Sequence, residues 1–178
     1  YTNDVIVRTK DEPTRANLYH MARILQSHAF MILTDTYGSI PYSEAGVGYT
    51  SQNFFPAYES QETIYPKIID EITQAVAGLG TGGNVETGDA LYQGNIVKWK
   101  KFGNSLLLRA GMRLSKADPA KAAATVTAAI GGDAAANLIL SNADNVIIKH
   151  DANFVNGHGN TVNGGEAANF YLAEPFIN

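Results

Sequence analysis

"ARILQSHAFMILTDTYGSIPYSEA", residues 22–45, decides the fold class because it reads as a long amphipathic helix that ends abruptly. From Pro13 to about Tyr37, apolar residues recur at intervals of three and four, which is the period of one helical face. Gly38 can adopt the left-handed conformation that ends helices, and Pro41 prevents continuation. The residues that form the apolar stripe, and that we expect to be buried, are Leu18, Met21, Ala22, Leu25, Ala29, Ile32 and Leu33.

The end of this helix, "TDTYGSIPYSEA" at residues 34–45, is more specific in composition than a polar loop requires. We expect a corner at which the chain turns and is held against neighbouring helices by Tyr37, Ile40 and Tyr42. Asp35 is expected to accept hydrogen bonds from backbone donors of the turn or from an arginine such as Arg109.

Three more helices are predicted downstream. One runs from Thr63 to Leu79; Pro66 fits it only if Thr63 is the N-cap, so that the proline stays in the first turn, and otherwise the helix kinks there. Its expected buried stripe is Ile64, Ile68, Ile72, Ala75, Val76 and Leu79. The next covers about Asn95 to Ser115, with Trp99, Phe102, Leu106, Ala110 and Leu114 on the core side.

Glycine and proline positions give further detail. Gly103 and Gly111 lie eight residues apart near one helical face, where they would allow another helix to approach closely. The segment 118–132 reads as a short helix with Asp118 as N-cap, Pro119 at its first position, and Gly131 and Gly132 past its end.

The expected organisation is a single partial domain that is mainly α. Its helical scaffold covers about residues 13–132, and a loop-rich, irregular region covers about residues 133–178. Within the second region we expect an extended stretch over 145–155 and no strong helix before about Glu166. The glycine-rich connector at residues 78–89 matches neither a dinucleotide-binding nor a P-loop pattern.

Composition excludes several classes of function. The 178 residues include 45% apolar and 17% charged residues, which indicates a folded chain with a largely neutral surface. A net charge of −4 provides no basic footprint for nucleic acid. Cysteine is absent, which rules out disulfides and Cys-type zinc sites, and no run approaches the roughly 18 apolar residues of a membrane span.

Catalytic patterns are lacking, so we expect neither an enzyme nor a cofactor. His20 and His28 lie eight residues apart on one helix and form no H-E-x-x-H motif, and no serine sits in a G-x-S-x-G elbow. Asp144 and Asp151 lie in an Asn- and Gly-rich segment that invites a calcium interpretation. That segment does not meet the D-x-[DN]-x-[DN]-G template, which favours solvated turns, and the calcium question stays open.

The loop of about twenty residues between the first two helices is rich in aromatic residues. Loops this long are usually functional or disordered, and the aromatics argue against disorder. Aromatic rings here either anchor the loop to the core or offer flat faces to a ligand such as a sugar ring. The candidate ligand-binding residues are Tyr42, Tyr49, Phe54, Phe55 and Tyr58.

Three segments in register resemble the SusD/RagB family, whose members include SusD-like outer-membrane lipoproteins. They are "ARILQSHAFMILTDTYGSIPYSEA" (22–45), "AYESQETIYPKIIDEI" (57–72) and "GDALYQGNIVKWKKFGNSLLLRAGMRLSKADPAKA" (88–122). The resemblance implies an α-superhelix of tetratricopeptide-like helical hairpins with long irregular loops. It also implies a surface-exposed outer-membrane protein that binds an oligosaccharide or other nutrient and caps a SusC-like TonB-dependent transporter.

The resemblance has limits that the residues define. A signal peptide and a lipidated cysteine do not occur in this chain, so membrane attachment is implied only through a lipid anchor of the parent protein. No binding residue carries over by motif, and no 34-residue repeat is evident by inspection. Two other roles remain open. One is a helical scaffold that docks on the transporter without touching the ligand. The other is a glycan-processing enzyme, for which no pair of acids can be named.

Overall fold

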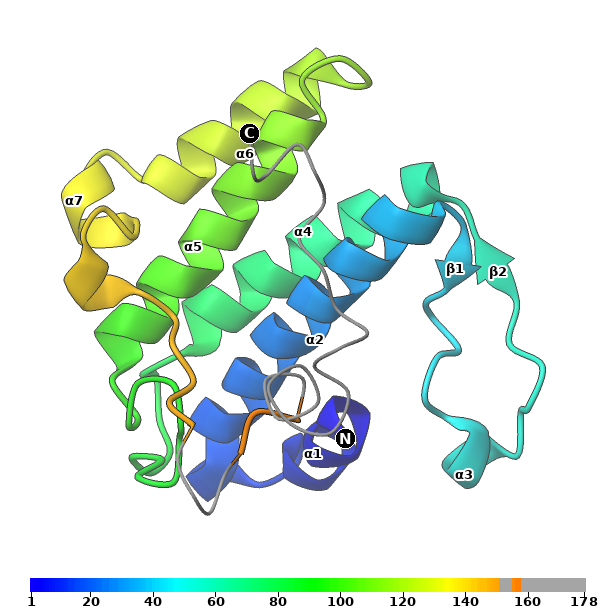
Figure 1. Ribbon diagram of the computed structural model, residues 1–178, viewed down its shortest axis with the longest axis horizontal. Helices are drawn as coiled ribbons and strands as arrows, with labels where there is room; N and C mark the ends of the chain where they lie inside the picture. The colour runs from blue at the N-terminus through cyan, green and yellow to red at the C-terminus, as the bar shows by residue number, and fades with distance from the viewer. Residues whose placement is uncertain (151–154, 158–178) are drawn as a thin grey trace, which may run out of the picture. The chain divides into compact units, whose positions relative to one another are not determined.

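A computed structural model describes residues 1–150 and 155–157, with the backbone alone at positions 49 and 50. The chain divides into two compact units, Tyr1–Val146 and Ile147–Asn178. Every helix and strand given below belongs to the first unit, which is mainly helical, as the sequence predicts (Figure 1).

Four long helices dominate this unit, and short elements connect them (Figure 1). The helices are α1 (Thr2–Thr9), α2 (Ala16–Tyr37), α3 (Gly48–Ser51), α4 (Gln61–Gly78), α5 (Ile96–Arg113), α6 (Pro119–Ile130) and α7 (Ala134–Asn137), with 3-10 turns at Pro13–Arg15 and Asn142–Asp144. Two short strands, β1 (Ile40–Pro41) and β2 (Tyr58–Glu59), pair antiparallel, with Ile40 opposite Glu59.

Helices α2 and α4 form an antiparallel hairpin that is tied at both ends. At the start of α2, the Asn17 side chain donates to the Asn84 carbonyl at 3.0 Å and accepts from the Gly80 amide at 2.9 Å, just past the end of α4. At the other end, the Gln61 side chain donates to the Thr34 carbonyl at 3.0 Å. These bonds fix the register of the two helices, because Asn17 lies almost fully buried between them.

The core lies where α2, α4 and α5 meet. Its completely or almost completely buried side chains are Ile24, Met31, Ile64, Ile68, Ile72, Leu79 and Trp99. Burying one aliphatic side chain of this size contributes about 1.5–3 kcal/mol. Because Ile64, Ile68 and Ile72 recur every four residues, they form a continuous apolar edge of α4 that packs against α2 and α5.

The stripe expected on α2 is only partly correct. Met21 and Ala22 are buried, but Ala29, Ile32 and Leu33 in the second half of the helix are exposed. The core-facing positions there are Ser27, Met31 and Thr34. Because two of these three residues are polar, a hydrophobicity pattern does not identify this face as buried. The buried Thr34 hydroxyl has a hydrogen-bond partner, since it donates to the Gly38 carbonyl at 2.7 Å.

Helix α4 begins earlier than predicted. Ser60 is the N-cap, and its hydroxyl accepts from the Thr63 amide at 3.3 Å. Thr63 is therefore inside the helix and Pro66 lies beyond the first turn, so the first of the two alternatives, with Thr63 as the N-cap, is wrong. The predicted buried stripe is confirmed, with Val76 only partly buried.

Helices α5 and α6 follow the predictions closely. Asn95 and Asp118 cap them by accepting from the Lys98 amide at 3.1 Å and the Lys121 amide at 2.9 Å. Close approach at the two glycines is confirmed, with a different partner at each. A Cβ on Gly103 would lie 2.3 Å from Val76 of α4, and one on Gly111 would lie 2.9 Å from Val126 of α6.

The corner after α2 turns as predicted, but its contacts differ. Gly38 has φ 74°, and its amide donates to the Thr34 carbonyl at 2.8 Å. Ile40 is buried as expected, whereas Tyr37 is 72% exposed and does not hold the turn against a neighbouring helix. Asp35 pairs with Arg113 rather than Arg109, one turn farther along α5, and accepts from the Tyr65 hydroxyl at 2.6 Å.

Both ends of the described chain add detail. Residues before Pro13 had no predicted element, yet they form α1, which packs on α2. Residues 145–150 form neither helix nor strand, while 151–154 and the stretch after Glu166 lie outside the described residues. Within the described part, no single helix has the length and apolarity of a membrane span. Only α6 and the segment 134–144, taken together across an 85° bend, pass by length and composition.

Candidate functional site

A groove of about 450 Å³ lies along one side of the α2–α4 hairpin. Its longest wall is a face of α2 whose side chains recur at intervals of four, three and four residues: Tyr19, Arg23, Gln26 and Phe30. Tyr19 and Phe30 are separated by eleven steps along the helix, which is about 16 Å. The groove therefore follows three turns of α2 and has the elongated shape that a chain-like ligand requires.

The facing wall comes from α4 and carries most of the charge. Its lining residues are Lys67 and, one turn farther along the helix, Asp70 and Glu71. The remaining wall is built by α1 and the segment that follows β1. The Asn3 side chain donates to the Gly46 carbonyl at 2.9 Å and so links these two parts. Segments far apart in the sequence thus meet around one groove.

Two aromatic rings form one end of the groove. The Phe30 and Tyr42 rings lie edge to face, with centroids 4.8 Å apart. Burial first, and then the carboxylates of Glu71 and Glu59, raise the pKa of the Tyr42 hydroxyl to about 12. That hydroxyl is therefore a neutral hydrogen-bonding group at any physiological pH.

Arg23 lies at the middle of the groove and is almost fully buried. Its Nε donates to Glu71 Oε2 at 2.8 Å and its Nη2 to Gln74 Oε1 at 3.0 Å, and its guanidinium lies 5.2 Å from the Tyr19 ring centroid. A buried guanidinium requires such partners, because desolvation of an unpaired charge is very costly. Arg23 therefore stabilises the wall of the groove, and its charge is not free to pair with a ligand.

Lys67 lies at the same end of the groove as Phe30 and Tyr42, with its Nζ 5.9 Å from the centroid of the Tyr42 ring. It forms an ion pair with Glu59 on β2 and donates to the Ser43 hydroxyl at 2.8 Å. The Lys67 hydrogen bond, followed by the bond from the Ser43 amide, lowers the pKa of the Glu59 carboxyl. This cluster fastens the start and the end of the long loop to α4, beside Tyr42.

The predicted ligand-binding residues do not gather in one place. Tyr42 lines the groove, whereas Phe54, Phe55 and Tyr58 do not and are 71%, 92% and 73% exposed. The side chain of Tyr49 lies outside what the structure describes. That these five contact a ligand stays a prediction. Among the four whose side chains the structure describes, only Tyr42 lines a groove.

Tyr19, Gln26 and Phe30 were missed by sequence reasoning. Their signal was present as an aromatic and polar stripe at helical spacing on α2, beside the apolar stripe. Nothing local distinguished that stripe from an ordinary solvated face. Its meaning depends on α1 and the loop, which build the rest of the groove.

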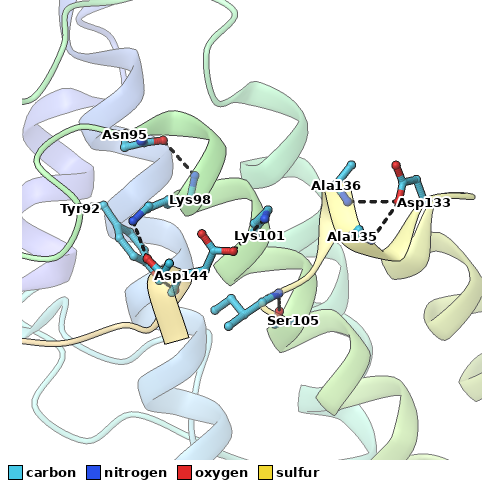
Figure 2. A network of polar contacts seen from close by, with 11 residues as sticks. Tyr92, Asn95, Lys98, Lys101, Ser105, Asp133, Ala135, Ala136 and Asp144 are labelled. Carbon is cyan, nitrogen blue, oxygen red and sulfur yellow. Dashed lines mark hydrogen bonds and ion pairs between the residues drawn. The ribbon is translucent and has the colours of Figure 1, made fainter. Parts of the chain in front are cut away.

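A separate polar network fastens the segment after α7 to α5 (Figure 2). Lys101 donates to Asp144 Oδ2 at 2.8 Å, the Tyr92 hydroxyl donates to the Asp144 carbonyl at 2.7 Å, and Lys98 donates to the Ala143 carbonyl at 2.6 Å. The Lys101 hydrogen bond is the main cause that lowers the pKa of the Asp144 carboxyl. Asp144 is thus used in folding, and Asp151 lies outside the described residues.

Metal ligation finds no support in the part of the chain with described coordinates. No group of three or more His, Cys, Asp or Glu side chains there is arranged to hold an ion. The groove itself contains two carboxylates, of which Glu71 is already paired with Arg23. Its chemistry is that of a polar and aromatic binding surface.

Comparison with known proteins identifies the family. A SusD-like family model, described as "Starch-binding associating with outer membrane", matches residues 2–178. The chain belongs to the SusD-like family. No curated protein matches it.

Solved SusD-like structures share the fold of this chain. The Bacteroidetes AC2a SusD-like protein is 35% identical with a TM-score of 0.72, over 84% of this chain and 26% of its own. A chitin-binding protein is 34% identical with a TM-score of 0.74, over 84% and 31%. A chitin-binding SusD homologue from Flavobacterium johnsoniae is 28% identical with a TM-score of 0.74, over 90% and 33%. The SusD-like chain studied here thus spans about a third or less of the length of these structures.

Proposed function

We propose that this SusD-like chain forms the glycan-binding helical part of a cell-surface nutrient-uptake protein. The observation that carries the proposal is the elongated groove between α2, α4 and the loop, with Tyr19, Phe30 and Tyr42 among its walls. Its volume lies within the roughly 300–1,000 Å³ usual for ligand sites. The role is binding without turnover.

The chemistry of the walls suits a sugar. Sugar rings present apolar C–H faces that pack on aromatic side chains, while their hydroxyl groups need hydrogen-bond partners. Tyr19, Phe30 and Tyr42 supply rings, and Gln26 and Asn3 supply amide groups. Chitin-binding relatives with the same fold support this choice of ligand class.

The uptake role rests on the family. We propose that the full-length protein is held at the outer membrane by a lipid anchor and that its partner is a SusC-like TonB-dependent transporter. The family description, which names association with the outer membrane, supports this location.

Isothermal titration of the full-length protein with a panel of oligosaccharides tests the binding role. Tyr42→Ala should weaken binding about tenfold, the effect of losing one aromatic contact. Tyr37→Ala is the matched control, because Tyr37 is an exposed aromatic outside the groove. Equal affinities of the two variants, or no binding by the unmodified protein, would contradict the proposal.

A second role is favoured by a different observation. Phe54 and Phe55, on the loop between β1 and β2, and Tyr58, at the start of β2, are exposed aromatic residues outside the groove. Exposed aromatic residues are enriched at protein interfaces. We therefore keep docking on the transporter as the alternative role, carried by this loop.

The two roles separate in one experiment. Phe54→Ala with Phe55→Ala should reduce co-purification with the transporter and leave glycan affinity unchanged if the loop docks. Loss of glycan affinity in that double variant, with the complex intact, would instead assign these rings to the ligand.

A further inference from the structure

The charges of the groove are unevenly compensated. Both cations on its walls are already engaged: Arg23 with Glu71 and Gln74, and Lys67 with Glu59 and Ser43. Arg23 is almost fully buried, and a ligand that displaced Lys67 would leave the largely buried Glu59 carboxylate without its partner, which is costly. Neither cation is therefore available to an anionic ligand at low cost.

Asp70 is the exception on the acidic side. It lines the groove from the exposed face of α4, and it makes no hydrogen bond or ion pair with any residue that the structure describes. Together with Glu71 and Glu59 it contributes to the field that disfavours a negative charge on the Tyr42 oxygen. The uncompensated charge of this groove is therefore negative.

The groups left free are uncharged. The Gln26 amide has no hydrogen bond within the described chain, and Asn3 uses one amide hydrogen on Gly46, which leaves its carbonyl oxygen available. The Tyr42 hydroxyl adds a neutral donor and acceptor. Hydroxyl and acetamido groups of a ligand can form hydrogen bonds with these uncharged donors and acceptors. Carboxylate and sulfate groups instead need cations or several donors.

We propose that the groove selects uncharged glycans, including N-acetylated ones, and rejects polyanionic glycans such as uronates and sulfated chains, with Asp70 as the residue that enforces the rejection. This inference rests on the proposed glycan-binding function. It adds the rejection of anionic glycans and the residue responsible for it, neither of which the family description specifies.

The test compares two probes on the full-length protein by isothermal titration at low and at physiological salt. Chitohexaose is the uncharged probe, and a hyaluronan hexasaccharide, which alternates N-acetylglucosamine with glucuronate, is the anionic one. We expect binding of the first and at least about tenfold weaker binding of the second at low salt, where charge repulsion is least screened.

Three variants assign the effect. Asp70→Asn should raise the ratio of hyaluronan affinity to chitohexaose affinity about fivefold at low salt, because it removes one negative charge near the ligand. Glu62→Gln is the matched control, an exposed acid on the same helix that does not line the groove. Gln26→Ala, which removes no hydrogen bond within the described chain, should weaken chitohexaose binding without altering the unfolding midpoint.

Each outcome decides between the two proposals. Hyaluronan binding as tight as chitohexaose binding, and sensitive to Gln26→Ala, would overturn the selectivity while sustaining the glycan-binding function. If neither probe and no other glycan binds, both the selectivity and the glycan-binding function are overturned. Rejection of hyaluronan that is the same in Asp70→Asn and Glu62→Gln would overturn the role of Asp70.

Discussion

Asp89 organises the turn that leads into α5. Its two carboxylate oxygens accept from the Leu91, Tyr92 and Gly94 amides at 2.9, 3.2 and 3.0 Å and from the Trp99 indole at 2.6 Å. One side chain thus satisfies four donors, most of them shielded from water. This explains in physical terms why "GDALYQGNIVKW" is such a specific segment.

Asp89→Asn should destabilise the protein by about 2–4 kcal/mol. The amide places an NH₂ group where one carboxylate oxygen accepts three bonds, and each donor left unsatisfied costs about 1–3 kcal/mol. Urea unfolding followed by Trp99 fluorescence measures the change. Asp4→Asn, at an exposed acid on α1, is the control and should change stability by less than about 0.5 kcal/mol.

Asp35 and Tyr65 should show energetic coupling. The Tyr65 ring is buried and its hydroxyl donates to Asp35 Oδ1, so Asp35→Ala leaves a buried donor without an acceptor. We expect a lower melting temperature for Asp35→Ala and a coupling of about 0.5–3 kcal/mol with Tyr65→Phe in a double-mutant cycle. An unchanged melting temperature for Asp35→Ala would show that this corner needs no acceptor.

At the scale of elements, the contact of α4 with α5 depends on Gly103. Gly103→Leu should lower the free energy of unfolding by about 1–3 kcal/mol or more, because even a Cβ would lie 2.3 Å from Val76 and 3.3 Å from Ile24. Gly82→Leu is the control, since nothing lies within 4 Å of a Cβ there. Similar urea midpoints for the two variants would mean that α4 and α5 can separate freely.

Elements whose signals are local could be predicted from the sequence. The caps of α5 and α6, the stop at Gly38 and the isoleucine stripe of α4 each depend on residues within one or two turns. The second half of α2 could not be predicted, because Ile32 and Leu33 are apolar yet exposed while Ser27 and Thr34 are buried. In that helix, tertiary packing overrides the pattern.

The groove was even less accessible to sequence reasoning. Tyr42 was named for its place in an aromatic loop, but its partner Phe30 lies twelve residues earlier on a helix, and Lys67 lies on another. Their meeting depends on the closed base of the loop and on α1 beside it. No periodicity within one segment encodes such a juxtaposition.

At the scale of the whole molecule, stability should fall between pH 7.5 and 5.5. Burial first, and then the charge of Arg23 or Arg109, lowers the pKa of His20 and of His28. The folded state therefore binds fewer protons than the unfolded chain, and stability is lost as the pH falls through about 6.5, the unfolded value. Urea unfolding at pH 7.5, 6.5 and 5.5 measures the loss.

His20→Gln combined with His28→Gln should flatten that pH dependence. The lowered pKa values of Glu59 and Asp144 have a different window: their stabilisation is present above the unfolded carboxyl values of about 4 and is lost only at more acidic pH. An equally steep loss in the double variant above pH 5.5 would assign the effect to other groups.

The pairing of β1 with β2 has a consequence for how this scaffold can diversify. The two strands, with Lys67 bridging Glu59 and Ser43, hold the base of the loop together. Lengthening a loop whose ends are already joined costs little, about 0.6 kcal/mol for each doubling. We therefore expect that insertions between Ser43 and Ala57 change the surface of the loop without shifting the register of α2 against α4.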